Sequence, residues 1–393
     1  MSEVKNIPRL RFPDFYSEWV NNRLGDLIDI KGRIGYRGYT TNDIVSKGEG
    51  SISLSPSNID SDGNLSYDNS TYITWEKYFE SPEIMVKEGF TILVKTGSSF
   101  GKSGLIKDLP EKSTINPQLV VLKPTKINPF FLFSLTTLGS VQKQIKTMVV
   151  GGTIPTLSQE NISNFNVNIP SLPEQQKIAD FLTAVDKRIE LLEKKKTLLE
   201  TYKKGVMKKI FNQEIRFKDD NGSDFPDWEE KKLGDITNKK SSNISANSIE
   251  FNEGNYTIYG ATGELKEVDF FEMNTPYISI VKDGSGVGRV KLCKPYSSVL
   301  GTLDIITNNE TSDLNFIYQF LTKTSFLKFV TGSSIPHIYY KDYSKLKLSV
   351  PSIKEQEKIS KFMSSIDSQI ELLVSQIDKS KTWKKGLLQK MFV

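Results

Sequence analysis

The chain has 393 residues, is 37% hydrophobic and 25% charged, and carries a formal net charge of +5. This length predicts two or three domains. We expect neither secretion nor a membrane span, because the N-terminus has no apolar segment and no apolar run approaches roughly 20 residues. A single cysteine fits a cytoplasmic location. The single cysteine, Cys293, excludes an internal disulfide, and the single histidine, His337, excludes multi-histidine metal sites. The composition favours a binding protein over an enzyme.

The first 168 residues predict a mixed α/β domain. Glycine, proline and asparagine separate short β-rich runs such as 90–94 and 118–122. The spacing of Phe and Leu predicts short helices over 128–146.

Residues 169–211 predict one long helix. Apolar residues recur at alternating spacings of four and three, which is typical of a coiled-coil seam. The predicted seam residues here are Ile178, Leu182, Val185, Ile189, Leu192 and Leu199. A helix of about 38 residues would measure ~57 Å.

The second half of the chain follows the same plan. Residues 212–349 again predict a mixed α/β domain, with β-rich runs at 277–281 and 346–350 and short helices over 313–330. Residues 350–393 predict a second long helix. Its seam residues are Ile359, Met363, Ile366, Ile370, Leu373 and Ile377.

The two halves form an internal repeat. Residues 169–211 align without a gap with the residues found 181 positions later, so that Glu174-Gln175 matches Glu355-Gln356. Upstream, GGTIP (151–155) matches GSSIP (332–336), and a Trp followed by Leu-Gly-Asp opens each half at Trp19 and Trp228. Two equal seams predict that the long helices pair with each other and hold two domains apart. The alternative is that each helix packs only on its own domain.

This duplicated set of motifs resembles the specificity (S) subunit of Type I restriction–modification systems, over essentially the whole chain. The resemblance implies an α+β fold with a pseudo-twofold repeat. Two mixed α/β target-recognition domains (1–168 and 212–349) would be separated by two conserved helical regions (169–211 and 350–393) that form an antiparallel coiled coil. Each domain would read one half of a bipartite site in double-stranded DNA, and differences between the halves predict an asymmetric site.

The resemblance also implies partners. The paired helices would set the spacer and dock two modification (methyltransferase) subunits, and restriction subunits with nuclease and translocase activity would join them. This chain would have no catalytic centre and no cofactor, since S-adenosylmethionine, ATP and Mg²⁺ would belong to the partner subunits.

Three fragments superficially suggest an enzyme. GSSFGKS (97–103) is one residue too short between its glycines for a phosphate-binding loop. NPFF (128–131), with Asn315 as its counterpart, resembles a methyltransferase loop but reads more simply as a helix start. PDWEEK (226–231) has its acidic residues too close together for a nuclease centre.

The candidate DNA-binding residues are polar and aromatic side chains in glycine-rich loops, because Arg, Lys, Asn and Gln read base edges and phosphates. In the first half they are Arg33, Tyr36, Arg37, Tyr39, Ser98, Ser99 and Lys102. In the second half they are Tyr256, Tyr259, Lys282, Ser285, Arg289, Ser334, His337, Tyr339, Tyr340 and Lys341. For the segment 31–39 a structural hairpin is the alternative, and for His337 a structural role is favoured.

Two other functions compete with DNA recognition. One is a coiled-coil protein–protein adaptor with two divergent ligand-binding modules. The other is a self-contained methyltransferase or nuclease, against which the missing cofactor motifs argue. The positive charge is concentrated on the helices, with 10 basic and 6 acidic residues in 173–210, so we expect modest DNA affinity from this chain alone.

Overall fold

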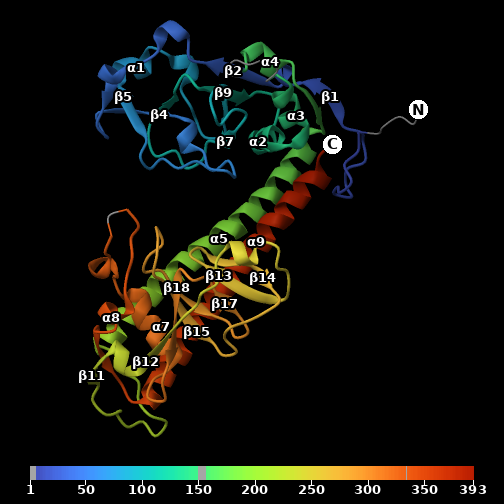
Figure 1. Cartoon of the computed structure of the whole chain (residues 1–393). Helices are drawn as coiled ribbons and strands as arrows, with labels where there is room; N and C mark the ends of the chain where they lie inside the picture. The colour runs from blue at the N-terminus through green and yellow to red at the C-terminus, as the bar shows by residue number, and fades with distance from the viewer. Residues whose placement is uncertain (1–5, 149–155, 333) are drawn as a thin grey trace. The chain divides into compact units, whose positions relative to one another are not determined.

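The computed structural model describes residues 6–148, 156–332 and 334–393, which form two compact units (Figure 1). Unit 1 comprises Met1–Leu191 and Ile377–Val393, and unit 2 comprises Leu192–Gln376. The GGTIP segment lies outside the described residues. Among the described residues, no helix combines the length and apolar character that crossing a bilayer requires.

Unit 1 is built on two four-stranded sheets. The first is antiparallel, in the order β2 (Ile28–Gly32), β9 (Leu119–Pro124), β6 (Thr91–Val94) and β7 (Ser103–Leu105). The second has the order β3 (Ile44–Val45), β5 (Thr71–Thr74), β4 (Gly50–Leu54) and β8 (Ser113–Ile115), with β4 and β8 parallel. All residues of β4 and β6 are buried, so these strands lie inside the domain core.

Apart from its parts of the two long helices, unit 1 has short helices. α1 (Trp75–Phe79) follows β5, and α4 (Gln159–Ser163) precedes the last strand of the domain. The segment predicted as helical, 128–146, forms α2 (Pro129–Thr137) and α3 (Gly139–Thr147). The backbone of Leu138 between them is extended, which ends the first helix.

Unit 2 repeats the first sheet with the same strand order. That order is β12 (Thr237–Ser241), β18 (Leu303–Asn308), β15 (Tyr277–Val281) and β16 (Val290–Cys293). Its second sheet has only three strands, in the order β14 (Gly263–Val268), β13 (Tyr256–Gly260) and β17 (Ser298–Val299). Three short helices complete the domain: α6 (Leu233–Ile236), α7 (Leu314–Lys323) and α8 (Tyr340–Tyr343). In the predicted helical segment 313–330, the α-helix therefore ends at Lys323, and a separate 3₁₀ turn follows at Leu327–Phe329.

A two-stranded antiparallel ribbon leads into and out of each domain. In unit 1, β1 (Val20–Arg23) pairs with β10 (Asn166–Ile169), and Val20 lies opposite Ile169. In unit 2, β11 (Glu229–Lys232) pairs with β19 (Lys347–Val350), with Glu229 opposite Val350. The two ribbons have the same length and register.

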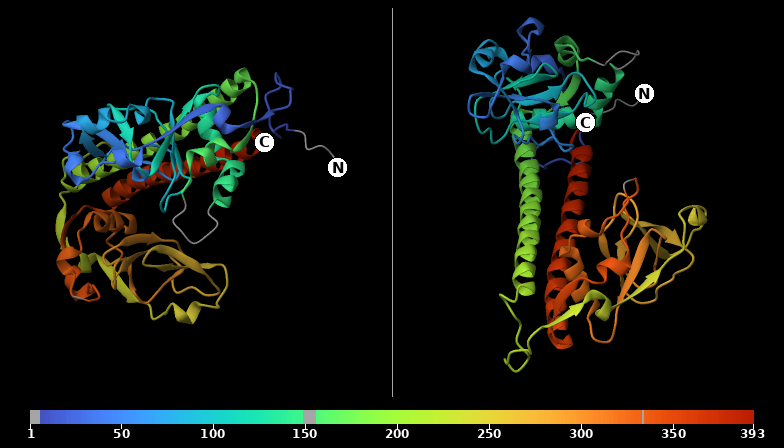
Figure 2. Two further views of the ribbon diagram at one scale, coloured as in Figure 1. Left: turned by 90° about the horizontal axis from the view of Figure 1, so that it is seen from above. Right: turned by 60° about the vertical axis from the view of Figure 1, so that its left-hand side comes forward.

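The long helices are α5 (Leu172–Phe211) and α9 (Ile353–Met391). They lie side by side as the green and red helices of Figures 1 and 2. The first half of α5 packs with the end of α9 in unit 1, and the second half of α5 packs with the start of α9 in unit 2. Leu387, Met391 and Phe392 belong to the core of unit 1, and Ile210 belongs to the core of unit 2. The predicted α+β fold with an antiparallel coiled coil is confirmed, and packing of each helix only on its own domain is wrong.

Candidate nucleic-acid interface

The paired helices carry two equivalent ion pairs beside an apolar seam. In unit 1 Lys384 Nζ lies 2.6 Å from a carboxylate oxygen of Asp186, and in unit 2 Lys203 Nζ lies 2.5 Å from one of Asp367. The two aspartates are repeat partners, and so are the two lysines. The seam residues Ile178, Leu182, Val185, Ile189, Ile359, Met363, Ile366, Leu373 and Ile377 are buried, while Leu192, Leu199 and Ile370 are half-buried. Both units thus use one pairing register.

A buried glutamate on each long helix binds the segment that opens each half of the chain. In unit 1 Glu174, 2% exposed, accepts hydrogen bonds from Arg11 at 2.7 Å and from Trp19 Nε1 at 3.3 Å. In unit 2 Glu355 accepts them from Arg216 at 2.9 Å and from Trp228 Nε1 at 3.1 Å. The hydrogen bonds to glutamate raise the pKa of both arginines. The repeated Trp and Glu are therefore one structural contact.

The glutamine of the repeated Glu-Gln motif holds a short helix in place. The side chain of Gln175 donates to the Pro170 carbonyl and accepts from the Asn128 backbone N–H, both at 2.9 Å. Gln356 makes the same two contacts with Pro351 and Asp313. Asn128 and Asp313 cap α2 and α7 respectively, so NPFF is a helix start. The assignment of Asn315 as the counterpart of Asn128 was wrong by two positions.

The predicted reading loop of the first half is partly internal. Arg33 is 5% exposed, donates to the Ile115 and Arg37 carbonyls at 3.1–3.2 Å, and lies 5.5 Å from the ring centre of Tyr39. The hydroxyl of Tyr39 accepts a hydrogen bond from Ser53. Arg37 donates to the Glu80 carbonyl, while the side chain of Tyr36 is outside the described part. Arg33 and Tyr39 therefore help to hold the loop. The segment does not form a hairpin, because β2 and β3 belong to different sheets.

The first glycine-rich segment is a turn between β6 and β7. Gly97 and Gly101 both have positive φ, and no helix follows the turn, so it lacks the helix N-terminus that a phosphate-binding loop provides. Ser98 is exposed and Ser99 is half-buried. Lys102 donates to the Ile59 carbonyl within the domain.

The candidates of the second half divide into buried and exposed groups. Tyr259 is 1% exposed and its hydroxyl accepts from the Lys294 backbone, and Tyr340 contacts Thr237. Lys282 is ion-paired inside the domain. Tyr256 packs against Phe271. The exposed candidates are Ser285, Arg289, Ser334, Tyr339 and Lys341.

His337 has a partner that the sequence did not reveal. Its Nδ1 contacts a carboxylate oxygen of Asp283, and its ring centre lies 4.1 Å from that of Tyr339. The backbone of His337 also forms a bridge with Thr331. The ring is thus fixed beside the second glycine turn.

A buried acidic network in unit 2 is the main feature that sequence reasoning missed. Asp304 on β18 is 2% exposed, and Tyr343 donates to it at 3.2 Å. Lys239 and Lys282 approach it at 3.4 and 3.6 Å. Burial, together with the nearby Asp304 charge, strongly raises the pKa of Tyr343. An aspartate between Leu303 and the apolar pair Ile305 and Ile306 was the signal that could have revealed the network.

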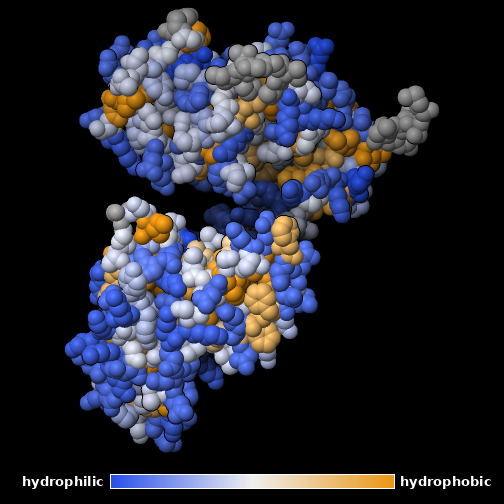
Figure 3. Space-filling view, in the orientation of Figure 1, coloured by the Kyte–Doolittle hydropathy of each residue, from blue (hydrophilic) through white to orange (hydrophobic). Residues whose placement is uncertain are grey.

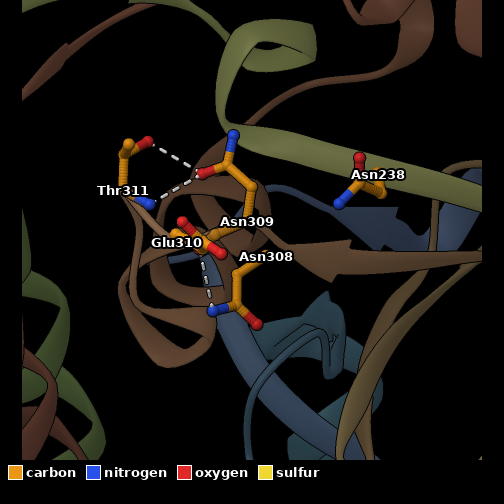
Figure 4. A pocket seen from close by; sticks show the side chains of 5 residues that line it. All are labelled: Asn238, Asn308, Asn309, Glu310 and Thr311. Carbon is orange, nitrogen blue, oxygen red and sulfur yellow. Dashed lines mark hydrogen bonds between the residues drawn. The ribbon is translucent and has the colours of Figure 1, made fainter.

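A polar surface pocket of about 660 Å³ lies on unit 2 between the ends of β12 and β18 (Figure 4). Its lining residues are Asn238, Asn308, Asn309, Glu310 and Thr311. Asn309 binds the Thr311 and Asp235 backbone, and Asn308 binds the Ser312 carbonyl, so these amides hold the loop. Residues 6–148, 156–332 and 334–393 contain no group of acidic, His and Cys side chains suited to a metal ion. The faces drawn in Figure 3 are mostly hydrophilic, with scattered apolar areas.

In fold, the chain is similar to specificity subunits of solved structure. The S subunit of a Type I restriction–modification system from M. genitalium has a TM-score of 0.66 at 18% identity and covers 98% of this chain and 99% of its own. A chain from a structural study of complex assembly in the type I system has a TM-score of 0.53 at 16% identity, covering 95% and 97%.

The sequence comparison gives the family. The model of the Type I restriction modification DNA specificity domain matches residues 16–201 and 226–379, so the chain belongs to that family. The putative type I restriction enzyme MjaX specificity subunit of Methanocaldococcus jannaschii is 27% identical over 324 residues, 75% of each chain. The MjaVIII specificity subunit of the same organism is 31% identical over 196 residues, 46% of each chain. The predicted specificity-subunit family is confirmed, and an adaptor without a DNA role is not favoured.

Proposed function

We propose that this chain is the non-catalytic DNA-recognition subunit of a Type I restriction–modification enzyme. Each unit carries one divergent domain of the specificity family, mounted on paired helices by the same Arg–Glu–Trp contact. That combination is the observation that carries the proposal. Because the domains differ in their second sheets and loops, they read two different half-sites of an asymmetric bipartite target.

The proposed DNA contacts are loop residues whose side chains are exposed or half-buried. They are Arg37, Ser98 and Ser99 in unit 1, and Ser285, Arg289, Ser334, Tyr339 and Lys341 in unit 2, with His337 fixed beside them. Arg33, Tyr259, Lys102, Lys282 and Tyr340 are left out, because their polar atoms are occupied within the domains.

The paired helices are proposed to set the spacer and to dock two methyltransferase subunits, with restriction subunits joining that assembly. S-adenosylmethionine, ATP and Mg²⁺ belong to those partners. Two helices that share one pairing register provide two equivalent docking surfaces, which fits two copies of one partner.

Methylome mapping tests the proposal. The chain is produced with its cognate methyltransferase subunit in a host that lacks adenine methylation, and the methylated sites are sequenced. We expect an asymmetric bipartite site, and neither subunit alone should methylate it. Methyl transfer by this chain alone, or a symmetric continuous site, would contradict the proposal.

A matched insertion tests the spacer. One heptad is added to both helices at facing positions, after Leu192 and after Ile377, which adds about 10 Å, or about three base pairs, without rotating the seam. We expect a longer spacer between unchanged half-sites. The control carries the heptad in α5 alone, which breaks the register and should abolish methylation. Altered half-site bases at an unchanged spacer would refute the role of the helices.

A further inference from the structure

Lys95 in unit 1 and Lys282 in unit 2 occupy the same position in the repeated sheet. The N–H of Lys95 donates to the Gln118 carbonyl, and the Lys95 carbonyl accepts from Leu157. Lys282 makes the same pair of bonds with Thr302 and Ile338. Both lysines come directly before a glycine turn, so the two domains place an ammonium group at the same sheet end.

The surroundings of the two lysines differ. Lys282 lies 3.6 Å from Asp304, which also receives Lys239 and the Tyr343 hydroxyl. The strand registers give two unit 1 counterparts, Val120 for Asp304 and Ile30 for Lys239. The repeat offset of 181 residues gives Ile162 for Tyr343. All three counterparts are apolar and buried. Of the polar members of this network, unit 1 therefore has only the lysine.

Lys95 is half-buried, and among the described residues its ammonium group has no carboxylate or hydrogen-bond partner. Burial lowers its pKa. A half-buried ammonium group without a counter-charge is less favourable than a fully hydrated one, because the part of its hydration that is lost is not replaced. In the second domain the carboxylate of Asp304 compensates the lost hydration of Lys282. In the first domain an anion from outside the chain would compensate the lost hydration of Lys95 in the same way.

The position of the ammonium fits such an anion. A Cβ atom on Gly32 would lie 3.6 Å from Lys95 Nζ and 3.4 Å from the side-chain amide of Gln159, so the ammonium group lies close to the backbone where β2 ends. Gly32 begins the 32–39 loop, and Lys95 itself begins the turn that carries Ser98 and Ser99. The ammonium thus lies between two loops of the proposed DNA surface.

We propose that Lys95 binds a backbone phosphate of DNA held by the first domain, and that the second domain lacks this contact because Asp304 neutralises Lys282. This inference rests on the proposed function. According to this inference, the first domain contributes more to the sequence-independent affinity for DNA than the second domain.

Salt dependence of binding tests the contact. The full-length chain, alone and with its methyltransferase subunit, is titrated with a random-sequence duplex of about 40 base pairs over a series of salt concentrations. We expect K95Q to lower the slope of log K against log salt by about one unit and K95R to keep it. K282Q is the matched control and should leave the slope unchanged. D304N, which frees Lys282, should raise the slope.

Thermal unfolding of the same variants separates binding from structure. We expect K95M to raise the midpoint of unit 1, since it removes an uncompensated charge, and K282M to lower that of unit 2. An unchanged slope in K95Q, with normal binding by the parent chain, would overturn the phosphate contact alone. Failure of the parent chain to bind any duplex, even with its partner, would overturn the proposed function as well.

Discussion

The two recognition domains make the same contacts with the long helices. They differ in the strand number of their second sheets and in the side chains inside their first sheets. Both use a buried Glu with Arg and Trp, a buried Gln beneath a helix start, and a ribbon of identical register. Their second sheets have four strands in one domain and three in the other. One first sheet contains a buried acidic network and the other an apolar equivalent.

This contrast separates the residues that attach each domain to the long helices from those that differ between the two domains. The two long helices present equivalent surfaces to the two domains. The contacts that attach the domains to these surfaces therefore use the same residue types. The sheets and loops that differ have no such shared partner. The following variants examine the contrast, beginning with the largest expected effect.

Removing Arg11 or Arg216 should destabilise the corresponding unit by similar amounts. Each change leaves a buried glutamate with only a tryptophan N–H, and stranding a buried charge costs about 3–5 kcal/mol. Denaturant unfolding of R11A and R216A measures the effect. R9A, an exposed arginine on the same segment as Arg11, is the control. A large loss in only one of the two units would break the equivalence.

The acidic network should matter in one domain only. Y343F removes the hydroxyl that donates to buried Asp304, and loss of a hydrogen bond to a charged group costs about 1.5–3 kcal/mol. Its counterpart Ile162 lies in an apolar environment, and I162V there should cost about 0.5–1.5 kcal/mol. Urea denaturation of the two variants compares the values. Equal losses would argue against a specific role of the hydroxyl.

The shared Leu-Gly-Asp motif should tolerate alanine in one copy. A Cβ atom on Gly25 would lie 1.8 Å from the Ser163 hydroxyl and 2.8 Å from its Cβ, whereas on Gly234 the nearest atom is 3.3 Å away. We expect G25A to lose about 1–3 kcal/mol through overpacking, and G234A to lose less. The unfolding midpoints of G25A and G234A, each compared with that of the parent chain, measure the two losses. In S163G/G25A most of the loss should disappear.

The interhelical ion pairs should contribute least. Asp186–Lys384 and Lys203–Asp367 are partly exposed, so each is expected to stabilise the fold by at most about 1 kcal/mol. Double-mutant cycles with D186N/K384Q and K203Q/D367N measure both couplings. Clearly unequal couplings would show that the two halves of the coiled coil differ despite their common register.

The helical part of the fold followed from the sequence because its period is long and duplicated. The predicted seam positions repeat from Ile178 to Leu199 in one helix and from Ile359 to Ile377 in the other. Strands such as Tyr277–Val281 were located by their β-branched residues. The hydrogen bond between Glu174 and Trp19 could not be predicted, because the two residues are 155 positions apart. In the sequence they are two repeated motifs with no visible connection.

Loop residues could not be sorted in this way. Arg33 looks like a base reader beside Gly and Tyr, yet its guanidinium bonds to a carbonyl 82 residues away. Tyr259 and Lys282 are likewise held by distant partners. Because such partners are set by tertiary packing, glycine-rich composition identified the loops but not which side chains remain accessible.

The matching ribbons have a consequence for engineering. Chain entry and exit lie across from each other at Val20 and Ile169 in one unit and at Glu229 and Val350 in the other, in the same hydrogen-bonded frame. We therefore expect the segments between those points to be interchangeable. Exchanging the two segments within one gene should yield a soluble protein whose target sequence is read in the opposite order.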